Sequence, residues 1–145
     1  MADIQEEYIH IQTTRFLVEP NEDAEIVNEG MYGAALSTYL EEELKKGGYI
    51  GRAVGEDFGY WLGFSRAEDP KASLEMAVYC PSRKNQNPME YVVLVMTHKT
   101  KRWVWSKFKY VSFEPLVLQF QQDVKAILKA APETKIFSIS DDMPD

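Results

Sequence analysis

The sequence predicts a single α+β domain with a mostly antiparallel sheet of five to six strands and two helices packed on one face. Two helical patterns separated by a run of about four extended segments predict this class, because such an order segregates helices from strands. The length of 145 residues, with 45% hydrophobic residues, is enough for one core without disulfides or metals. We see no internal boundary, so the domain is expected to span residues 1–145, with a disordered acidic tail at 141–145.

The first strand and the first helix follow from two different periodicities. Apolar and polar side chains alternate within residues 8–18, which is typical of one or two strands, and a loop is expected over 20–30. A helix is predicted over 31–46, because Leu36, Leu40 and Leu44 recur every fourth residue. Gly47 and Gly48 supply its stop.

Glycine occupies every fourth position from Gly47 to Gly63. Each interior glycine would cost a helix about 0.5–1 kcal/mol relative to alanine, so the segment 49–64 is predicted to form a hairpin that turns near 55–57. Strand side chains alternate between faces, which places Trp61 on the face of Gly59 and Gly63 and Tyr60 on the other. Beside two bare backbone positions, Trp61 has room for a partner to approach.

The remaining elements follow from the same criteria. They are a polar loop over 65–71, a strand over 72–80, a loop over 81–88, a strand over 89–97, a short strand over 103–108 and a last strand over 135–140. The strand over 89–97 is the most apolar and is expected at the centre of the sheet. The second helix is predicted to begin with Ser112 as its N-cap and to carry an apolar stripe of Leu116, Phe120, Val124, Ile127 and Leu128.

The reactive residue types form no recognisable catalytic or metal-binding pattern. Cys80 is the only cysteine, which excludes an internal disulfide and favours a reducing cytoplasm, and no apolar run is long enough to span a membrane. Nothing in the spacing brings Cys80 to His10 or His98, so we expect a buried structural cysteine, no catalytic residue, no metal and no cofactor. Glu56 and Asp57 could share acid–base work, or simply hydrogen-bond a turn.

The run Tyr-Leu-(x)3-Leu-(x)2-Gly-Gly that begins at Tyr39, followed by Gly55-Glu56-Asp57-Phe58-Gly59-Tyr60, resembles a group of small bacterial proteins of unknown function. In that group a leucine helix precedes a Glu-Asp-Trp-Gly-Trp-like turn. Phe58 and Tyr60 depart from its pattern, standing where tryptophans are expected. The resemblance covers about a fifth of the chain; it implies a bacterial α+β domain with a possible site at the turn, and no activity.

Charge is distributed unevenly along the chain. Residues 1–70 carry 15 Asp or Glu and 5 Lys or Arg, whereas residues 71–145 carry 8 and 11, and the net charge is −7. The acidic front half disfavours nucleic acid and anionic membranes and would suit a basic protein partner. Segment 99–110 opposes this trend with five basic residues and four aromatic ones. It is typical of a single-strand nucleic-acid platform, an interfacial membrane segment or an edge strand guarded by lysines, and we favour the edge strand.

These observations favour a non-enzymatic protein-binding module, for example one that neutralises a basic toxin. Tryptophan and tyrosine are enriched at interfaces, and the chain has three and eight of them. The alternative is a small-ligand sensor or an uncharacterised enzyme with a cleft beside the 49–64 hairpin. The candidate binding residues are Glu56, Asp57, Tyr60, Trp61, Trp103 and Trp105.

Overall fold

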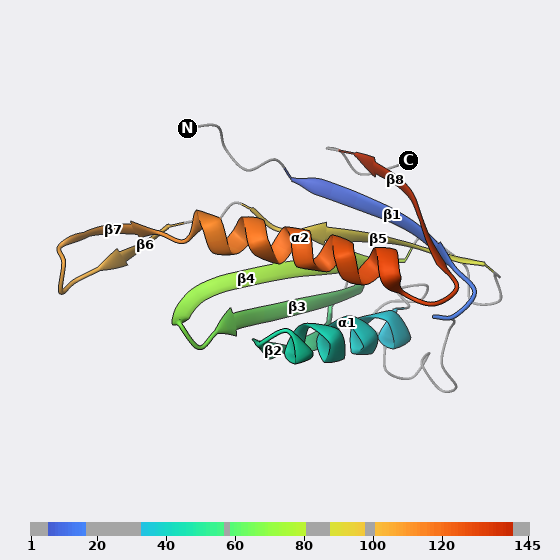
Figure 1. The fold of residues 1–145 in the computed structure, drawn as a ribbon, viewed down its shortest axis with the longest axis horizontal. Coiled ribbons are helices and arrows are strands. Elements are labelled where there is room, and N and C mark those ends of the chain that lie inside the picture. Colours follow the sequence, from blue (N-terminus) through green and yellow to red (C-terminus); the bar gives the residue numbers. More distant parts are fainter. Residues whose placement is uncertain (1–5, 17–32, 57–58, 81–87, 98–100, 141–145) are drawn as a thin grey trace.

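The structure is a computed structural model that describes residues 6–16, 33–56, 59–80, 88–97 and 101–140, and for residues 56, 69, 71, 101–104 and 111 it describes the backbone alone. The helices and strands in chain order are β1 (Glu7–Thr13), α1 (Ala34–Lys46), β2 (Tyr49–Glu56), β3 (Gly59–Arg66), β4 (Asp69–Tyr79), β5 (Met89–Val95), β6 (Lys101–Val104), β7 (Lys109–Ser112), α2 (Glu114–Ala130) and β8 (Thr134–Ser140) (Figure 1).

The main sheet has six strands in the order β2-β3-β4-β5-β1-β8, and every neighbouring pair is antiparallel. The predicted α+β class, the antiparallel sheet and the two helices are therefore confirmed. Strand β5 lies inside the sheet between β4 and β1, as its continuous apolar run predicts. Strands β6 and β7 form a separate two-stranded sheet.

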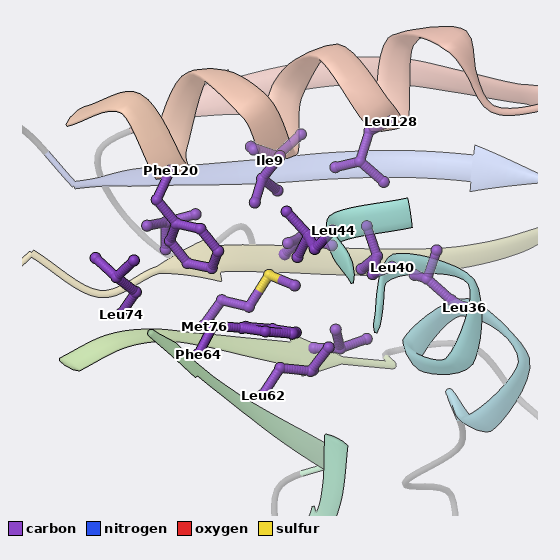
Figure 2. Close-up of a cluster of buried hydrophobic side chains, with 14 of the residues drawn as sticks. Ile9, Leu36, Leu40, Leu44, Leu62, Phe64, Leu74, Met76, Phe120 and Leu128 are labelled. Atoms are coloured by element: carbon purple, nitrogen blue, oxygen red, sulfur yellow. The ribbon is translucent and has the colours of Figure 1, made fainter. Parts of the chain in front are cut away.

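Both helices bury their apolar stripes against one face of the sheet (Figure 2). Leu36, Leu40 and Leu44 of α1 are buried there, which confirms the helix predicted from a leucine at every fourth residue. The helices meet side chains that alternate along the strands, such as Leu62 and Phe64 of β3. In α2 the fully buried apolar residues are Val117, Phe120, Val124 and Leu128, whereas Leu116 and Ile127 are only partly buried.

Local signals set the helix ends close to the predicted positions. The N–H of Gly47 donates to the carbonyls of Glu43 and Leu44 at the end of α1. The Ser112 hydroxyl accepts from the N–H of Glu114 at 3.2 Å, although the residue in the N-cap position of α2 is Phe113, one place later than predicted.

The predicted hairpin over 49–64 is confirmed, with Gly51 opposite Phe64 and Glu56 opposite Gly59. The polar loop predicted over 65–71 is wrong, because Arg66 pairs with Asp69 and only Ala67 and Glu68 form the turn. Proline has no N–H to donate to a neighbouring strand. Pro70 is nevertheless compatible with strand β4, because β4 pairs with β5 only from Met76 onward and no β5 carbonyl lies opposite Pro70.

The strand predicted over 103–108 is also wrong in its extent. Strand β6 ends at Val104, residues 105–108 turn, and β7 returns antiparallel, with Val104 opposite Lys109. The alternation of basic and aromatic residues continues through this turn, which is why the sequence pattern alone gives no sign of the reversal. The predicted loop over 20–30, most of the loop over 81–88 and the tail at 141–145 lie outside the described residues.

Candidate functional site

The β6–β7 hairpin presents the most exposed aromatic side chains among the described residues. Figure 1 shows it extending away from the main sheet, beyond the N-terminal end of α2. Its main contacts are within itself, between β6 and β7. Trp105 is 76% exposed, Phe108 75% and Tyr110 67%. Aromatic side chains of this size usually bury most of their surface, so their exposure on one ribbon is the chief functional signal of the fold.

The tip of this hairpin is a closed turn rather than a loose end. The N–H of Phe108 donates to the carbonyl of Trp105 at 3.2 Å, and the two rings meet edge to face with centroids 6.1 Å apart. Phe108 has a φ of +51°, in the left-handed region that bulky side chains avoid at a cost of about 1–2 kcal/mol. Exposed Lys107 and Lys109 flank this ring, so the tip combines aromatic surface with positive charge.

We refer to Trp105, Lys107, Phe108, Lys109 and Tyr110 as the aromatic tip. Of the predicted binding residues, Trp105 belongs to it, and Trp103 lies in β6 opposite Tyr110. Phe108 and Tyr110 were absent from the predicted set. They belong to the 99–110 segment, but the edge-strand interpretation gave no reason to single them out.

The other predicted binding residues lie on the β2–β3 hairpin and do not converge. Tyr60 and Trp61 are neighbours on β3 and point to opposite faces. Tyr60 packs against the core, where its ring lies near Gly33. Glu56 ends β2 with only its backbone described, and Asp57 lies outside the described residues. Tyr60 and Trp61 therefore cannot line the same side of one cleft.

The space expected beside Trp61 is filled by Trp61 itself. A Cβ atom placed on Gly63 would lie 2.2 Å from Cη2 of the indole, so the ring folds over this glycine and is half-buried. Glycine at 63 thus makes room for the tryptophan of its own strand.

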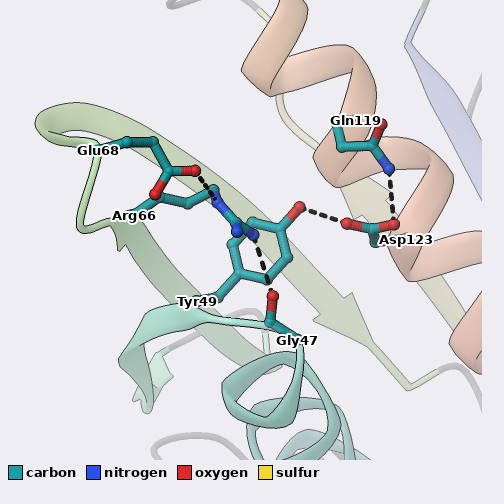
Figure 3. Close-up of polar contacts among 6 residues, drawn as sticks. All are labelled: Gly47, Tyr49, Arg66, Glu68, Gln119 and Asp123. Atoms are coloured by element: carbon teal, nitrogen blue, oxygen red, sulfur yellow. Dashed lines mark hydrogen bonds and ion pairs between the residues drawn. The ribbon is translucent and has the colours of Figure 1, made fainter.

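A polar cluster that the sequence did not predict joins both helices to β2 and β3 (Figure 3). The Tyr49 hydroxyl donates to Oδ2 of Asp123 at 2.6 Å, and Gln119 donates to Oδ1 at 2.8 Å. Arg66 lies over the Tyr49 ring at 4.7 Å, donates to the carbonyl of Gly47 and pairs with Glu68. No sequence signal links Tyr49 to Asp123, because they are 74 residues apart.

The chemistry of this cluster is that of a structural tie. Burial raises the pKa of the Tyr49 phenol far above its ordinary value, and the hydrogen bond to Asp123 raises it further. The phenol therefore keeps its proton at neutral pH and donates a hydrogen bond to the carboxylate, which is the opposite of what a general base requires.

The remaining reactive side chains support no catalytic arrangement within the described part of the chain. Cys80 is buried after β4, where it packs in the core. His10 on β1 lies 3.9 Å from the Glu90 carboxylate and edge to face with Phe137, and His98 lies outside the described residues. Among the described residues, no three His, Cys, Asp or Glu side chains gather to hold a metal, and no helix is long and apolar enough to cross a membrane.

Comparison of the chain with known proteins adds no relative to this geometry: no family model, curated protein or solved structure matches it.

Proposed function

We propose that the protein is a non-enzymatic protein-binding module that contacts its partner through the aromatic tip of the β6–β7 hairpin. The observation that carries this proposal is the exposure of Trp105, Phe108 and Tyr110 on a ribbon whose main contacts are internal. Interface hot spots are enriched in Trp and Tyr, which bury a large area with little loss of side-chain entropy.

The backbone of Phe108 supports the same function. A left-handed φ strains this residue, and its exposed ring buries little surface in return within the chain. Glycine or asparagine would relieve the strain at this position. A bulky ring at a strained, exposed position is explained if the ring is buried against a partner.

The charge of the tip indicates which surface it would contact. Lys107 and Lys109 are exposed beside the aromatic rings, so the tip favours an acidic patch with an apolar centre. The basic partner suggested by the acidic front half would have to bind elsewhere, for example beside Glu42 on α1, and stays a separate prediction.

The alternative of a ligand cleft beside the 49–64 hairpin receives less support. It requires Tyr60 and Trp61 to act together, whereas they occupy opposite faces of β3. Trp61 also covers Gly63 with its own ring, which removes the opening expected there.

Site-specific photocrosslinking in cells that make the protein tests the proposal. A photoreactive amino acid placed at Ser106, in the turn of the tip, is expected to give one discrete protein adduct. The same group at Ile50, which is exposed on β2, is the matched control and is expected to give none. Adding W105A or F108N to the protein that carries the photoreactive group at Ser106 should abolish the adduct while the circular dichroism spectrum stays unchanged.

Three outcomes would overturn the proposal. One is an adduct that survives W105A together with F108N. Another is crosslinking to lipid alone. The third is retention on immobilised single-stranded nucleic acid that falls steeply with added salt and is lost with W105A, which would assign the tip to nucleic acid instead.

A further inference from the structure

A groove runs between α2 and the last strand of the sheet, at the opposite side of the fold from the β2–β3 hairpin. It encloses about 670 Å³. Its lining residues are Gln122, Lys125, Ala126 and Lys129 from the helix and Thr134, Lys135, Ile136 and Ile139 from the strand. The floor is apolar and three lysines border it, so we call it the lysine groove.

Strand β8, which forms one wall of the lysine groove, is an edge strand. It pairs with β1 on one side, and no described strand pairs with its other side. Phe137 and Ile139 on this strand are exposed apolar residues. An edge strand offers every second N–H and C=O group to an incoming extended chain, so β8 can accept a further strand.

The other edge of the same sheet is strand β2, and a side chain of α1 covers part of it. The Glu41 carboxylate of α1 accepts the N–H of Ala53 on β2 at 2.7 Å, which occupies an edge donor with a side chain of the same protein. Helix α1 also packs along β2. The β2 edge is thus capped in part from within the fold, whereas no described strand pairs with the outer side of β8, whose register against β1 shifts between Ile136 and Ser138.

The β8 edge is held firmly in place. The turn before it contains Glu133 at a φ of +53°, and this strained residue is fixed by two bonds from Thr14, one to its carbonyl at 3.1 Å and one to its carboxylate. The hydroxyls of Thr13 and Thr134 bond to each other at 2.9 Å. A preorganised edge lowers the entropy cost of adding a strand.

Charge decides which strand the groove would accept. Lys129 and Lys135 are exposed, and Lys125 already bonds Glu7 at 2.9 Å, so the free positive charge lies at the groove's border. An extended segment with apolar side chains on one face and carboxylates on the other would cover the isoleucine floor on the helix side and place its carboxylates beside Lys135, which pairs with Gln12 on the opposite face of the sheet. Pairing of β8 with β8 of a second copy would instead bring two lysine grooves together, and the like charges would repel.

We propose that the lysine groove and the β8 edge bind an acidic extended segment of a partner protein as a seventh strand of the sheet. The segment's apolar side chains rest on Ile136 and Ile139 on the helix side of the sheet, and its carboxylates, which point to the other face, reach Lys135. This site is separate from the aromatic tip and does not depend on the function proposed for it.

Peptide binding followed by amide NMR tests the proposal on the full chain. The probe is a labelled peptide of alternating Glu and Val, and the matched control is a peptide of alternating Lys and Val. The acidic probe is expected to bind, to slow hydrogen exchange in β8, and to lose at least tenfold in affinity with K135E. W105A should leave its affinity unchanged.

A second probe separates strand addition from simple electrostatic attraction. Methylation of alternate backbone nitrogens in the Glu–Val peptide preserves its charge and removes its edge donors, so binding should be lost. Equal binding of this methylated peptide, shifts confined to α2, or no detectable binding of the acidic probe would each overturn the proposal. Slowed exchange in β8 that depends on protein concentration without peptide would assign the edge to a second copy.

Discussion

The β2–β3 and β6–β7 hairpins both carry aromatic side chains, but among the described residues the first buries them fully or in part and the second exposes them. Both are antiparallel, both carry a tryptophan, and both mix aromatic with charged or small residues. In the first, Phe64 is buried in the core at 4% exposure. In the second, Phe108 is 75% exposed. The difference arises because β3 pairs with β4 and lies under both helices, whereas the contacts of β6 and β7 are mainly with each other.

This comparison separates stability from recognition. The aromatic residues of the β2–β3 hairpin stabilise the fold by leaving water, while those of the aromatic tip keep their apolar surface available for a partner. A substitution should therefore act on folding in one hairpin and on binding in the other. Paired substitutions test that division, beginning with the largest expected change in the free energy of unfolding.

The largest difference is expected between two phenylalanine substitutions. Phe64→Ala removes a buried ring that packs against Tyr49 and Phe120, and should lower the free energy of unfolding by about 3–5 kcal/mol. Phe108→Ala removes an exposed ring and should change it by less than about 0.5 kcal/mol. Urea unfolding followed by circular dichroism measures both. Similar losses for the two variants would mean that the tip is part of the folded core.

The next largest difference is expected between two glycines of the β2–β3 hairpin. A Cβ atom on Gly59 would lie 2.2 Å from the carbonyl oxygen of Val78, and the φ of Gly59 is +146°. Gly59→Ala should therefore cost about 2 kcal/mol or more, because the backbone must move or remain strained.

Gly55 supplies the matched control for this substitution. A Cβ atom there would meet only Tyr60, at an ordinary contact distance of 3.8 Å. Gly55→Ala should be neutral or stabilise the protein by up to about 1 kcal/mol, since alanine restricts the unfolded chain. Thermal and urea unfolding of both variants check this. Equal destabilisation would show that the glycine spacing serves the turn as a whole and not the contact with β4.

The contrast between the hairpins also shows which features of the fold can be predicted from the sequence and which cannot. A leucine at every fourth residue favours an amphipathic helix, and a glycine at every fourth residue disfavours one. The helix α1 and the β2–β3 hairpin were therefore predictable. The exposure of Trp105 and the half-burial of Trp61 were not, because both depend on what packs against each strand. Periodicity describes a strand's two faces without saying whether anything covers them.

The tight turn before β4 and the long-range contacts could not be predicted, because no local sequence pattern marks them. The tight turn at Ala67 and Glu68 lacks glycine and is followed by Pro70, which suggested a loop. Lys129 and Lys135 border one groove only because β8 returns beside α2, and no local pattern encodes that. Segment 99–110 is recognisable in the sequence by its basic and aromatic residues, but the exposure of its tip follows only from the fold, and the lysine groove has no sequence signal at all.

The smallest predicted effect concerns the polar cluster that ties the β2–β3 hairpin to α2. Tyr49→Phe removes the hydroxyl that donates to Asp123 and should lower the free energy of unfolding at neutral pH by about 1 kcal/mol. Tyr110→Phe removes an exposed hydroxyl from the aromatic tip and should change it by less than about 0.5 kcal/mol. Urea unfolding of the two variants compares them directly.

The effect of Tyr49→Phe should also depend on pH, with a sign fixed by the raised pKa of Tyr49. The unfolded phenol ionises near its ordinary pKa of about 10, whereas the folded one holds its proton to higher pH. The stabilisation is therefore complete below about pH 10 and is lost as the pH rises toward the folded pKa. Unfolding at about pH 8 and about pH 11 should show the wild type losing more stability than Tyr49→Phe, because other tyrosines act equally in both. A gap between the two proteins that widens with pH would mean that the Tyr49 proton does not stabilise the tie.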